Sequence, residues 1–257
     1  MNKGRSKLFN RLMHRRVMKR WATAVAEAPT ADLSRLRVQR NAARELRGQL
    51  NSLLQVADGR LAMPHANRKS IPLPSGANWA WRPMLWSGAL ADKGIASAKN
   101  KTRIGEDVAI FHDCKASELT LRQVRNTDAE VLAPFWLRLD VFNFDGSFLS
   151  LVLDFPPDAI EGLRKKHIVK VCCHLETERP IEVFMRLNIK NGPNTEQMVQ
   201  ELPMDGSEQK VEFDLAYTEV NERRLEAIWM DLIFENPDMN QIVIRDLTCC
   251  RYPRAEL

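Results

Sequence analysis

The sequence predicts a mainly β protein, an antiparallel β-sandwich of the jelly-roll type with an α-helical extension at its N-terminus. From about residue 104 onward, apolar and polar residues alternate with a period of two, as in half-buried strands. Almost no helical pattern separates these short segments, which excludes alternating βαβ units. Residues 1–57 instead repeat apolar residues every three or four positions, as amphipathic helices do.

The alternation is clearest in residues 181–190, where five apolar side chains face one way and polar side chains the other. An Asp-Gly pair at 145–146 separates two strong strands and predicts a β-hairpin, and 191–193 predict a further turn. Residues 156–166 form the only helical pattern in this block. The expected strands are 107–112, 118–125, 135–144, 147–154, 167–175, 181–190, 196–202, 210–214, 227–234 and 241–250.

Residues 5–28 predict a helix with an apolar stripe opposite a cationic face. Pro29 ends it, and Thr30 or Asp32 can cap a second helix that runs to about residue 57. The two helices can fold as a hairpin or form one long arm that pairs with another chain. The stripe contains Phe9, Met13, Val17, Trp21 and Val25, and the cationic face contains Arg11, Arg15, Arg16, Lys19 and Arg20.

Residues 58–103 are rich in proline and glycine, which excludes a long regular element. Yet Trp79, Trp81 and Trp86 lie within them, and three tryptophans are too apolar to remain in water. We therefore expect an ordered, extended strap across the sandwich that can contribute an edge strand. The predicted domains are the basic helices at 1–57, this strap at 58–103 and the sandwich at 104–257.

Charge divides the chain in the same way. Residues 1–103 carry 21 Lys and Arg against 5 Asp and Glu, a balance of +16, whereas residues 104–257 carry 17 against 28, a balance of −11. Such asymmetry is typical of two units with different surroundings. No apolar run is long enough to span a membrane and no secretory signal is present, so we expect a cytoplasmic protein, with peripheral attachment to the inner membrane as an option.

The basic helix at 5–28 leaves several partners open. Its apolar stripe can pack on the second helix, with the charges merely solvated. Alternatively it can bind an anionic membrane surface. Non-specific nucleic-acid binding, or a protein partner such as the acidic part of another copy, are further options. The residues of this surface are Arg11, Arg15, Arg16, Lys19, Arg20 and Trp21.

The sequence gives little support for disulfides, a metal site, a cofactor site or a catalytic site. The five cysteines are odd in number and include two adjacent pairs, unlike a secreted disulfide framework, so buried thiols are expected. A metal site using one thiol from each pair lacks two further ligands. No P-loop, GxGxxG or GxSxG motif occurs, and we predict neither a cofactor nor a metal. An enzyme could use only His112 and Cys114, which share a strand face while Asp113 leaves it.

The polar face of the sandwich is the better candidate for a binding site. Arginine, aspartate and asparagine alternate along several strands there, near one tryptophan. If these strands are neighbours, the mixture can hold sugar hydroxyls around a stacked ring; otherwise it is a solvated face with cross-strand ion pairs. The candidate residues are Arg138, Asp140, Arg186, Asn188, Trp229, Asp231 and Arg245.

The segments FHDCKASELTLRQVRN, LDVFNFDGSFLSLVLDFP and IWMDLIFENPDMNQIVIRDLTCCRYPR resemble an uncharacterised bacterial domain-of-unknown-function family, over most of residues 70–257. The last segment also resembles the closing hairpin of galactose-binding-like jelly rolls, the fold of many carbohydrate-binding modules. That resemblance implies a fold and supplies no catalytic residues, and the calcium-binding loop of many such modules is not recognisable here.

The sequence thus favours a non-catalytic binding module that recognises a glycan or a similar polar ligand on its sandwich face, tethered by a basic helix. One alternative is a structural or adaptor protein at the membrane surface or in a protein complex. The other is an enzyme that uses His112 and Cys114.

Overall fold

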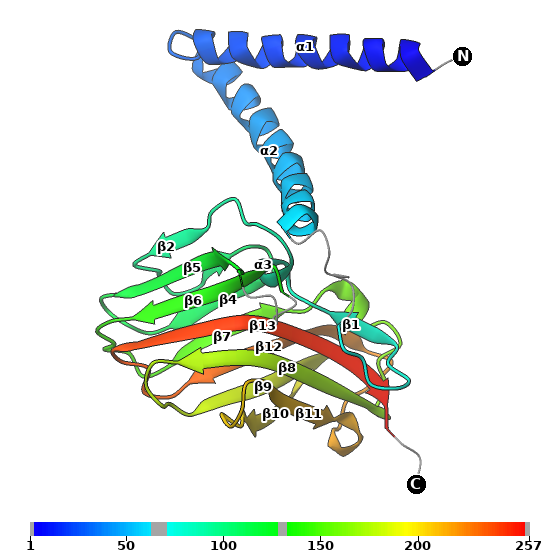
Figure 1. The fold of residues 1–257 in the computed structure, drawn as a ribbon, viewed down its shortest axis with the longest axis vertical. Helices are drawn as coiled ribbons and strands as arrows, with labels where there is room; N and C mark the ends of the chain where they lie inside the picture. Colours follow the sequence, from blue (N-terminus) through cyan, green and yellow to red (C-terminus); the bar gives the residue numbers. More distant parts are fainter. Residues whose placement is uncertain (1–2, 63–70, 128–132, 255–257) are drawn as a thin grey trace. The chain divides into compact units, whose positions relative to one another are not determined.

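Two antiparallel β-sheets lie face to face in the computed structural model, which describes residues 3–62, 71–127 and 133–254 (Figure 1). Both sheets are antiparallel throughout their described strands, so the predicted β-sandwich with N-terminal helices is confirmed. Sheet A contains, in order, β11 (Gln209–Asp214), β8 (His167–Thr177), β13 (Asn240–Pro253), β6 (Phe135–Val141), β5 (Leu119–Arg125) and β2 (Gly94–Ala96). Sheet B contains, in order, β10 (Asn194–Glu201), β9 (Val183–Asn191), β12 (Leu225–Phe234), β7 (Leu149–Asp154), β4 (Val108–His112) and β3 (Thr102–Ile104).

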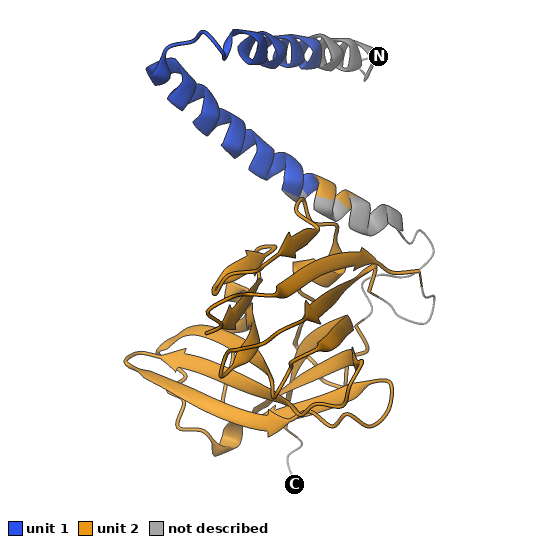
Figure 2. Ribbon diagram, turned by 90° about the vertical axis from the view of Figure 1, so that its left-hand side faces the viewer, with its two compact units in different colours: residues 1–53 blue, residues 54–257 orange. Residues whose placement is uncertain are grey.

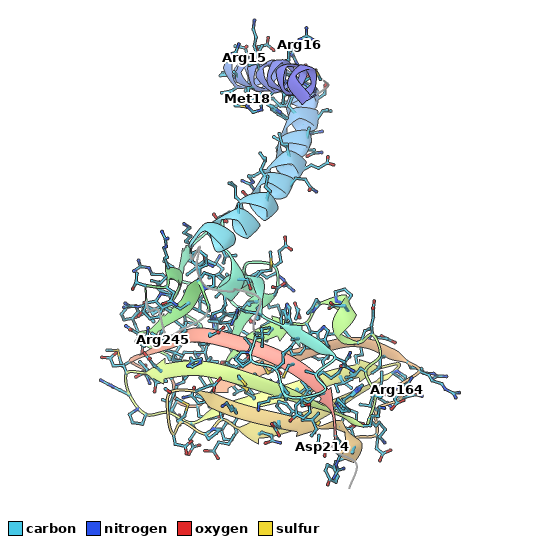
Figure 3. The ribbon with its side chains drawn as sticks, turned by 45° about the vertical axis from the view of Figure 1, so that its right-hand side comes forward. Arg15, Arg16, Met18, Arg164, Asp214 and Arg245 are labelled. Atoms are coloured by element: carbon cyan, nitrogen blue, oxygen red, sulfur yellow. The ribbon has the colours of Figure 1, made fainter. Side chains whose placement is uncertain are left out.

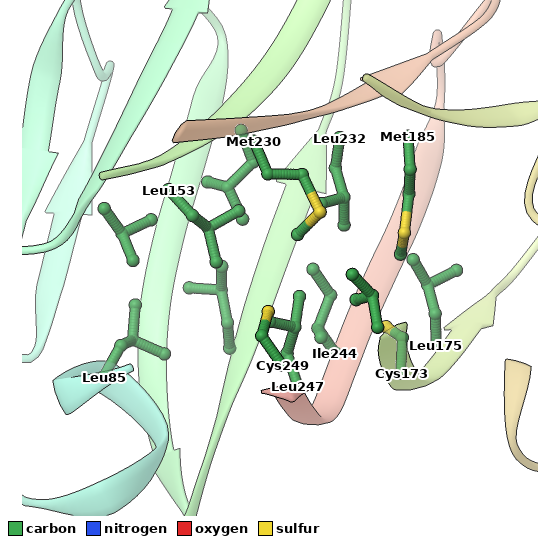
Figure 4. Packing of buried hydrophobic residues seen from close by; sticks show 14 of the residues in the cluster. Leu85, Leu153, Cys173, Leu175, Met185, Met230, Leu232, Ile244, Leu247 and Cys249 are labelled. Carbon is green, nitrogen blue, oxygen red and sulfur yellow. The ribbon is translucent and has the colours of Figure 1, made fainter. Parts of the chain in front are cut away.

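The core lies between the two sheets and follows directly from the period-two pattern. On β9, alternate residues from Val183 to Ile189 are buried, as the alternation predicts. Met185 and Met230 of sheet B extend toward Leu175, Ile244 and Leu247 of sheet A (Figure 4). Each strand of the sandwich therefore presents one face to this core and the other face outward.

The Trp-rich strap is built into sheet A. Strand β6 pairs with β13 only from Asn240 to Ile244, after which the register of β13 shifts. Beyond that point β1 (Trp79–Trp81) takes the same side of β13, pairing with Cys249–Arg251. The strap thus continues sheet A where β6 leaves it.

The residues that follow β1 plug the gap between β1 and β6. The short helix α3 (Met84–Ser87) places Trp86 in the core with 0% of its surface exposed, and its indole nitrogen donates to the Ile244 carbonyl at 2.9 Å. Arg82 forms a two-pronged ion pair with Asp246 at 2.9 and 2.8 Å, and both side chains are more than nine-tenths buried.

Three local predictions are wrong. Residues 156–166 contain only a short 3₁₀ helix, η1 (Pro157–Ala159), because Gly162 adopts a left-handed φ of 69° that ends helical winding. The Asp-Gly pair at 145–146 does not close a hairpin, because β6 and β7 belong to different sheets. The closing hairpin implied by resemblance is likewise absent, since β12 lies in sheet B and β13 in sheet A. In both cases the chain crosses from one sheet to the other.

The chain forms two compact units, Met1–Leu53 and Leu54–Leu257 (Figure 2). The first contains α1 (Lys3–Glu27) and most of α2 (Leu33–Ala62). Asp32 caps α2 by accepting the backbone N–H of Arg35 at 2.9 Å, and the Arg35 side chain pairs with Glu27 at 2.6 Å. Among the described helices, none combines the length and the apolar character that a transmembrane span requires.

Removing the indole that plugs sheet A tests the role of the strap. We expect Trp86→Ala to lower the free energy of unfolding by about 4 kcal/mol, because it leaves a large cavity and an unpaired carbonyl. Trp136 of β6, half-buried on the outer face, is the matched control, and Trp136→Ala should cost about 1 kcal/mol. Urea unfolding followed by circular dichroism measures both. Equal losses for the two variants would contradict this role.

Candidate ligand-binding site

The outer face of sheet B brings together four of the seven candidate residues. In the register of β9 and β12, Arg186 lies opposite Asp231 and Asn188 opposite Trp229. On the other side of β9, Gln197 of β10 lies opposite Asn188. Directly opposed residues on neighbouring strands share a face, so these side chains form one continuous polar row.

Hydrogen bonds join the row into a network centred on Asp231. Oδ2 of Asp231 accepts hydrogen bonds from Nε and Nη2 of Arg186, both at 2.7 Å, and from Nδ2 of Asn188 at 3.1 Å. Oδ1 of Asn188 in turn accepts a hydrogen bond from Nε2 of Gln197 at 2.9 Å. These contacts restrain the Arg186, Asn188 and Asp231 side chains before any ligand arrives, and such preorganisation reduces the entropy cost of binding.

One acceptor of this network is left over. The Asp231 side chain is only 5% exposed, yet its three contacts all fall on Oδ2, and Oδ1 has no partner among the described residues. The hydroxyl of Ser150 likewise has no partner among them, although Ser150 is 7% exposed. A buried polar atom without a hydrogen bond is costly, so both atoms favour a ligand or water that donates to them.

Aromatic and aliphatic side chains form the rest of the site. Phe111 of β4, Phe148 and Trp229 line the same groove of about 380 Å³. The indole nitrogen of Trp229 has no hydrogen-bond partner within the described residues, and Trp229 is half-buried. The remaining lining residues are Ser150, Val152, Arg186, Asn188, Gln197, Asp231 and Ile233.

Asp113 holds one wall of the groove in place. Its carboxylate accepts the backbone N–H and the hydroxyl of Ser147 at 2.7 and 2.6 Å and the N–H of Phe148 at 3.3 Å. The hydrogen bonds from Ser147 lower the pKa of Asp113, so it stays ionised. Gly146 packs against this carboxylate so closely that an added Cβ would lie 2.6 Å from it. Phe148 is therefore fixed by the turn that carries it.

The other three candidates do not belong to this site. Arg138, Asp140 and Arg245 lie on β6 and β13 of sheet A, so the expectation of one shared face is corrected. Arg138 pairs with Asp140 at 2.8 Å, and Arg245, labelled in Figure 3, pairs with Glu176 at 2.6 Å. The Arg245 guanidinium also lies 4.4 Å from the centre of the Trp136 ring. The outer face of sheet A therefore carries ion pairs, one within β6 and one between β13 and β8, as the alternative of a solvated face expected.

The geometry at His112 does not form a base–nucleophile pair. Nε2 of His112 lies 2.9 Å from the Ala98 carbonyl, and Nδ1 accepts the backbone N–H of Cys114 at 3.2 Å. Both ring nitrogens are thus engaged by the backbone. Burial raises the pKa of the Cys114 thiol, which disfavours the reactive thiolate. His112 and Cys114 are therefore not arranged as a catalytic pair.

The described cysteines and acidic residues do not form a metal centre. All five thiols are free, with Cys173, Cys249 and Cys250 buried. In the part of the chain that the structure describes, no group of three or more His, Cys, Asp or Glu side chains is arranged to hold a metal ion.

The predicted partner surface lies on α1. Arg15, Arg16, Lys19 and Arg20 are exposed, and Trp21 is half-buried near the joint with α2. The Arg11 side chain lies outside the described residues.

The stripe itself is not covered by α2, because Met13, Val17 and Val25 remain 43%, 44% and 73% exposed. Packing of the whole stripe on the second helix is therefore not what the structure shows.

A family model described as "Family of unknown function (DUF6478)" matches residues 1–257. No curated protein matches the chain. Among solved structures, the chain is similar to the family 11 carbohydrate-binding module from Clostridium thermocellum in complex with a beta-1,3-1,4-mixed-linked tetrasaccharide, at 11% identity and a TM-score of 0.40, over 65% of this chain and 99% of that chain.

Two further similar structures differ in kind. The CBM22-1 xylan-binding domain from Paenibacillus barcinonensis Xyn10C shows 8% identity and a TM-score of 0.36, over 65% of this chain and 99% of that chain. The enzymatically active domain of bacteriophage CBA120 tailspike protein 4 shows 5% identity and a TM-score of 0.40, over 58% of this chain and 21% of that chain. At this level of similarity no residue is carried over to this chain.

Removing the centre of the groove network should destabilise the sandwich. We expect Asp231→Ala to cost about 2 kcal/mol, because it strands the Arg186 charge and the buried Asn188 amide. Asp154, whose ion pair with Arg103 is about half exposed, is the matched control, and Asp154→Ala should cost less than about 0.5 kcal/mol. Chemical unfolding at neutral pH measures both. A cost at Asp231 no larger than at Asp154 would show that the network is not preorganised.

Proposed function

The chain belongs to the family of unknown function DUF6478, and we propose that it is a non-catalytic binding module whose sheet B groove takes a glycan or a similar polar ligand. The observation that carries this proposal is the buried Asp231, whose Oδ1 accepts no hydrogen bond from the described residues and which lines a groove that also contains Trp229. A sugar hydroxyl donates to such an oxygen, while the apolar face of the same ring packs on an aromatic side chain.

The composition of the groove supports recognition of a polar ligand. Arg186 and Asp231 neutralise each other, so the groove offers hydrogen-bond donors and acceptors without a strong net charge. Three aromatic side chains supply apolar surface for the non-polar faces of a sugar ring. Because the side chains are already fixed, binding orders few additional groups.

The same composition argues against glycoside hydrolysis at this position. Hydrolysis generally needs two carboxyl groups that flank the scissile bond. Asp231 is the only carboxylate among the described lining residues, and it is held by Arg186 and Asn188. The proposed module binds its ligand and leaves it unchanged.

Substitution of the aromatic wall tests this function. We expect Trp229→Ala to raise the dissociation constant about tenfold, the equivalent of ~1.4 kcal/mol of lost stacking and burial. Asp231→Asn should weaken binding by a similar factor, because an amide that turns its nitrogen toward the ligand no longer accepts a hydroxyl. Calorimetric titration with a panel of soluble gluco-, xylo-, galacto- and manno-oligosaccharides, after screening on a glycan array, gives these values.

Trp136→Ala on sheet A is the control, since Trp136 lies on the opposite outer face and should leave affinity unchanged. A folded wild-type protein that binds no member of the array or the panel would refute the proposal. So would binding that Trp136→Ala weakens as much as Trp229→Ala does.

A further inference from the structure

The helices of unit 1 expose large apolar side chains along both of their lengths. On α1, Met13, Val17, Met18 and Val25 are between 43% and 73% exposed. On α2 the exposed fractions run from 38% to 74%. The α2 residues are Leu33, Val38, Leu46, Leu50 and Leu53. Isolated exposed apolar side chains are ordinary, but a series on two neighbouring helices is typical of an interaction surface.

The same unit is strongly cationic. Residues 1–53 contain 13 Lys and Arg against 3 Asp and Glu, a balance of +10. One of the three acidic residues, Glu27, is paired with Arg35. On α1, Arg15 and Arg16 are exposed, as is the apolar Met18. Positive charge and exposed apolar surface therefore occur on the same helices.

These two properties together select among the candidate partners. A second copy of unit 1 would bring another +10 to the interface, and like charges oppose pairing of the two. Nucleic acid attracts the charges but leaves the apolar side chains in water. An anionic phospholipid surface satisfies both, because its phosphates attract the basic side chains while the boundary with the acyl chains accepts apolar ones.

We propose that α1 and α2 form a reversible attachment arm for anionic phospholipid bilayers, lying on the bilayer surface rather than crossing it. Both helices contribute, since each of them exposes several large apolar side chains. Each basic side chain near such a surface strengthens binding about fivefold, the equivalent of ~1 kcal/mol, so several acting together give stable but salt-sensitive attachment. This arm is independent of the sheet B groove.

Co-sedimentation of the full chain with vesicles tests the arm. We expect binding to phosphatidylcholine vesicles that contain about a third phosphatidylglycerol. Binding should be at least tenfold weaker to pure phosphatidylcholine vesicles, and it should be lost when salt is raised to about 1 M. Equal binding to both vesicle types, or binding to neither, would overturn the proposal.

Paired substitutions separate the two contributions. Replacing Arg15 and Arg16 together by alanine should weaken vesicle binding about 25-fold, whereas Arg164→Ala, at an exposed arginine of the sandwich, should have no effect. Met18→Asp should weaken binding about tenfold or more, because it removes an apolar side chain that is 56% exposed and adds a negative charge. Met239→Asp is its control, since Met239 is 51% exposed on the sandwich.

Sedimentation velocity without lipid distinguishes the other occupants. Self-association that Met18→Asp abolishes would assign the surface to a second copy and overturn the proposal. Vesicle binding that the arginine variants reduce but Met18→Asp leaves intact would show charge attraction alone and would also overturn it. Circular dichroism of each variant verifies that the helices persist. Glycan affinity should be unchanged in all of them, so failure of the arm and failure of the groove remain distinguishable.

Discussion

The structure depends on the need to pair β13 along both of its sides. This strand has 14 residues and pairs with β8 over almost its whole length, but β6 covers its other side only as far as Ile244. Buried peptide groups without partners are costly, so a second segment has to continue the ladder. The Trp-rich strap continues this ladder, because its strand β1 pairs with β13. The indole N–H of Trp86 donates a hydrogen bond to the Ile244 carbonyl. The strap is therefore part of the sandwich.

That arrangement leaves the two outer faces with different properties. Sheet A carries the strap and isolated ion pairs such as Arg138 with Asp140 and Arg245 with Glu176, which satisfy one another locally. Sheet B carries a network centred on the buried Asp231 carboxylate, and the described residues donate hydrogen bonds to only one of its two oxygens. Arginines and carboxylates that are already paired have little to offer a ligand, whereas sheet B provides an acceptor atom without a partner among the described residues, together with an aromatic wall.

Local patterns in the sequence were sufficient to predict β4 to β13. The three-residue strands β2 and β3 were missed, because so short a segment shows no period-two pattern. The assignment of strands to sheets depends on long-range pairing. The alternation of 181–190 identified β9, because burial of every second side chain leaves a direct trace in the sequence. Arg138–Asp140 and Arg186–Asn188 show the same alternation on strands of opposite sheets, so no local signal separates them. Gln197, Phe111 and Phe148 were missed for the same reason, since only register and the Asp113-held turn bring them to the groove.

The position of the strap in the chain has a mechanical consequence. Unit 2 begins at Leu54, and the first of its described strands is β1. If the helices were held at one surface and the groove at another, tension would enter the sandwich through the strap. The β1–β13 ladder and the buried Arg82–Asp246 pair would then carry the first load, before any other strand of either sheet. The resistance of the sandwich to pulling thus depends on the contacts of β1 and Arg82. If these contacts were weak, the strap would detach under a lower force than the rest of the sandwich can withstand.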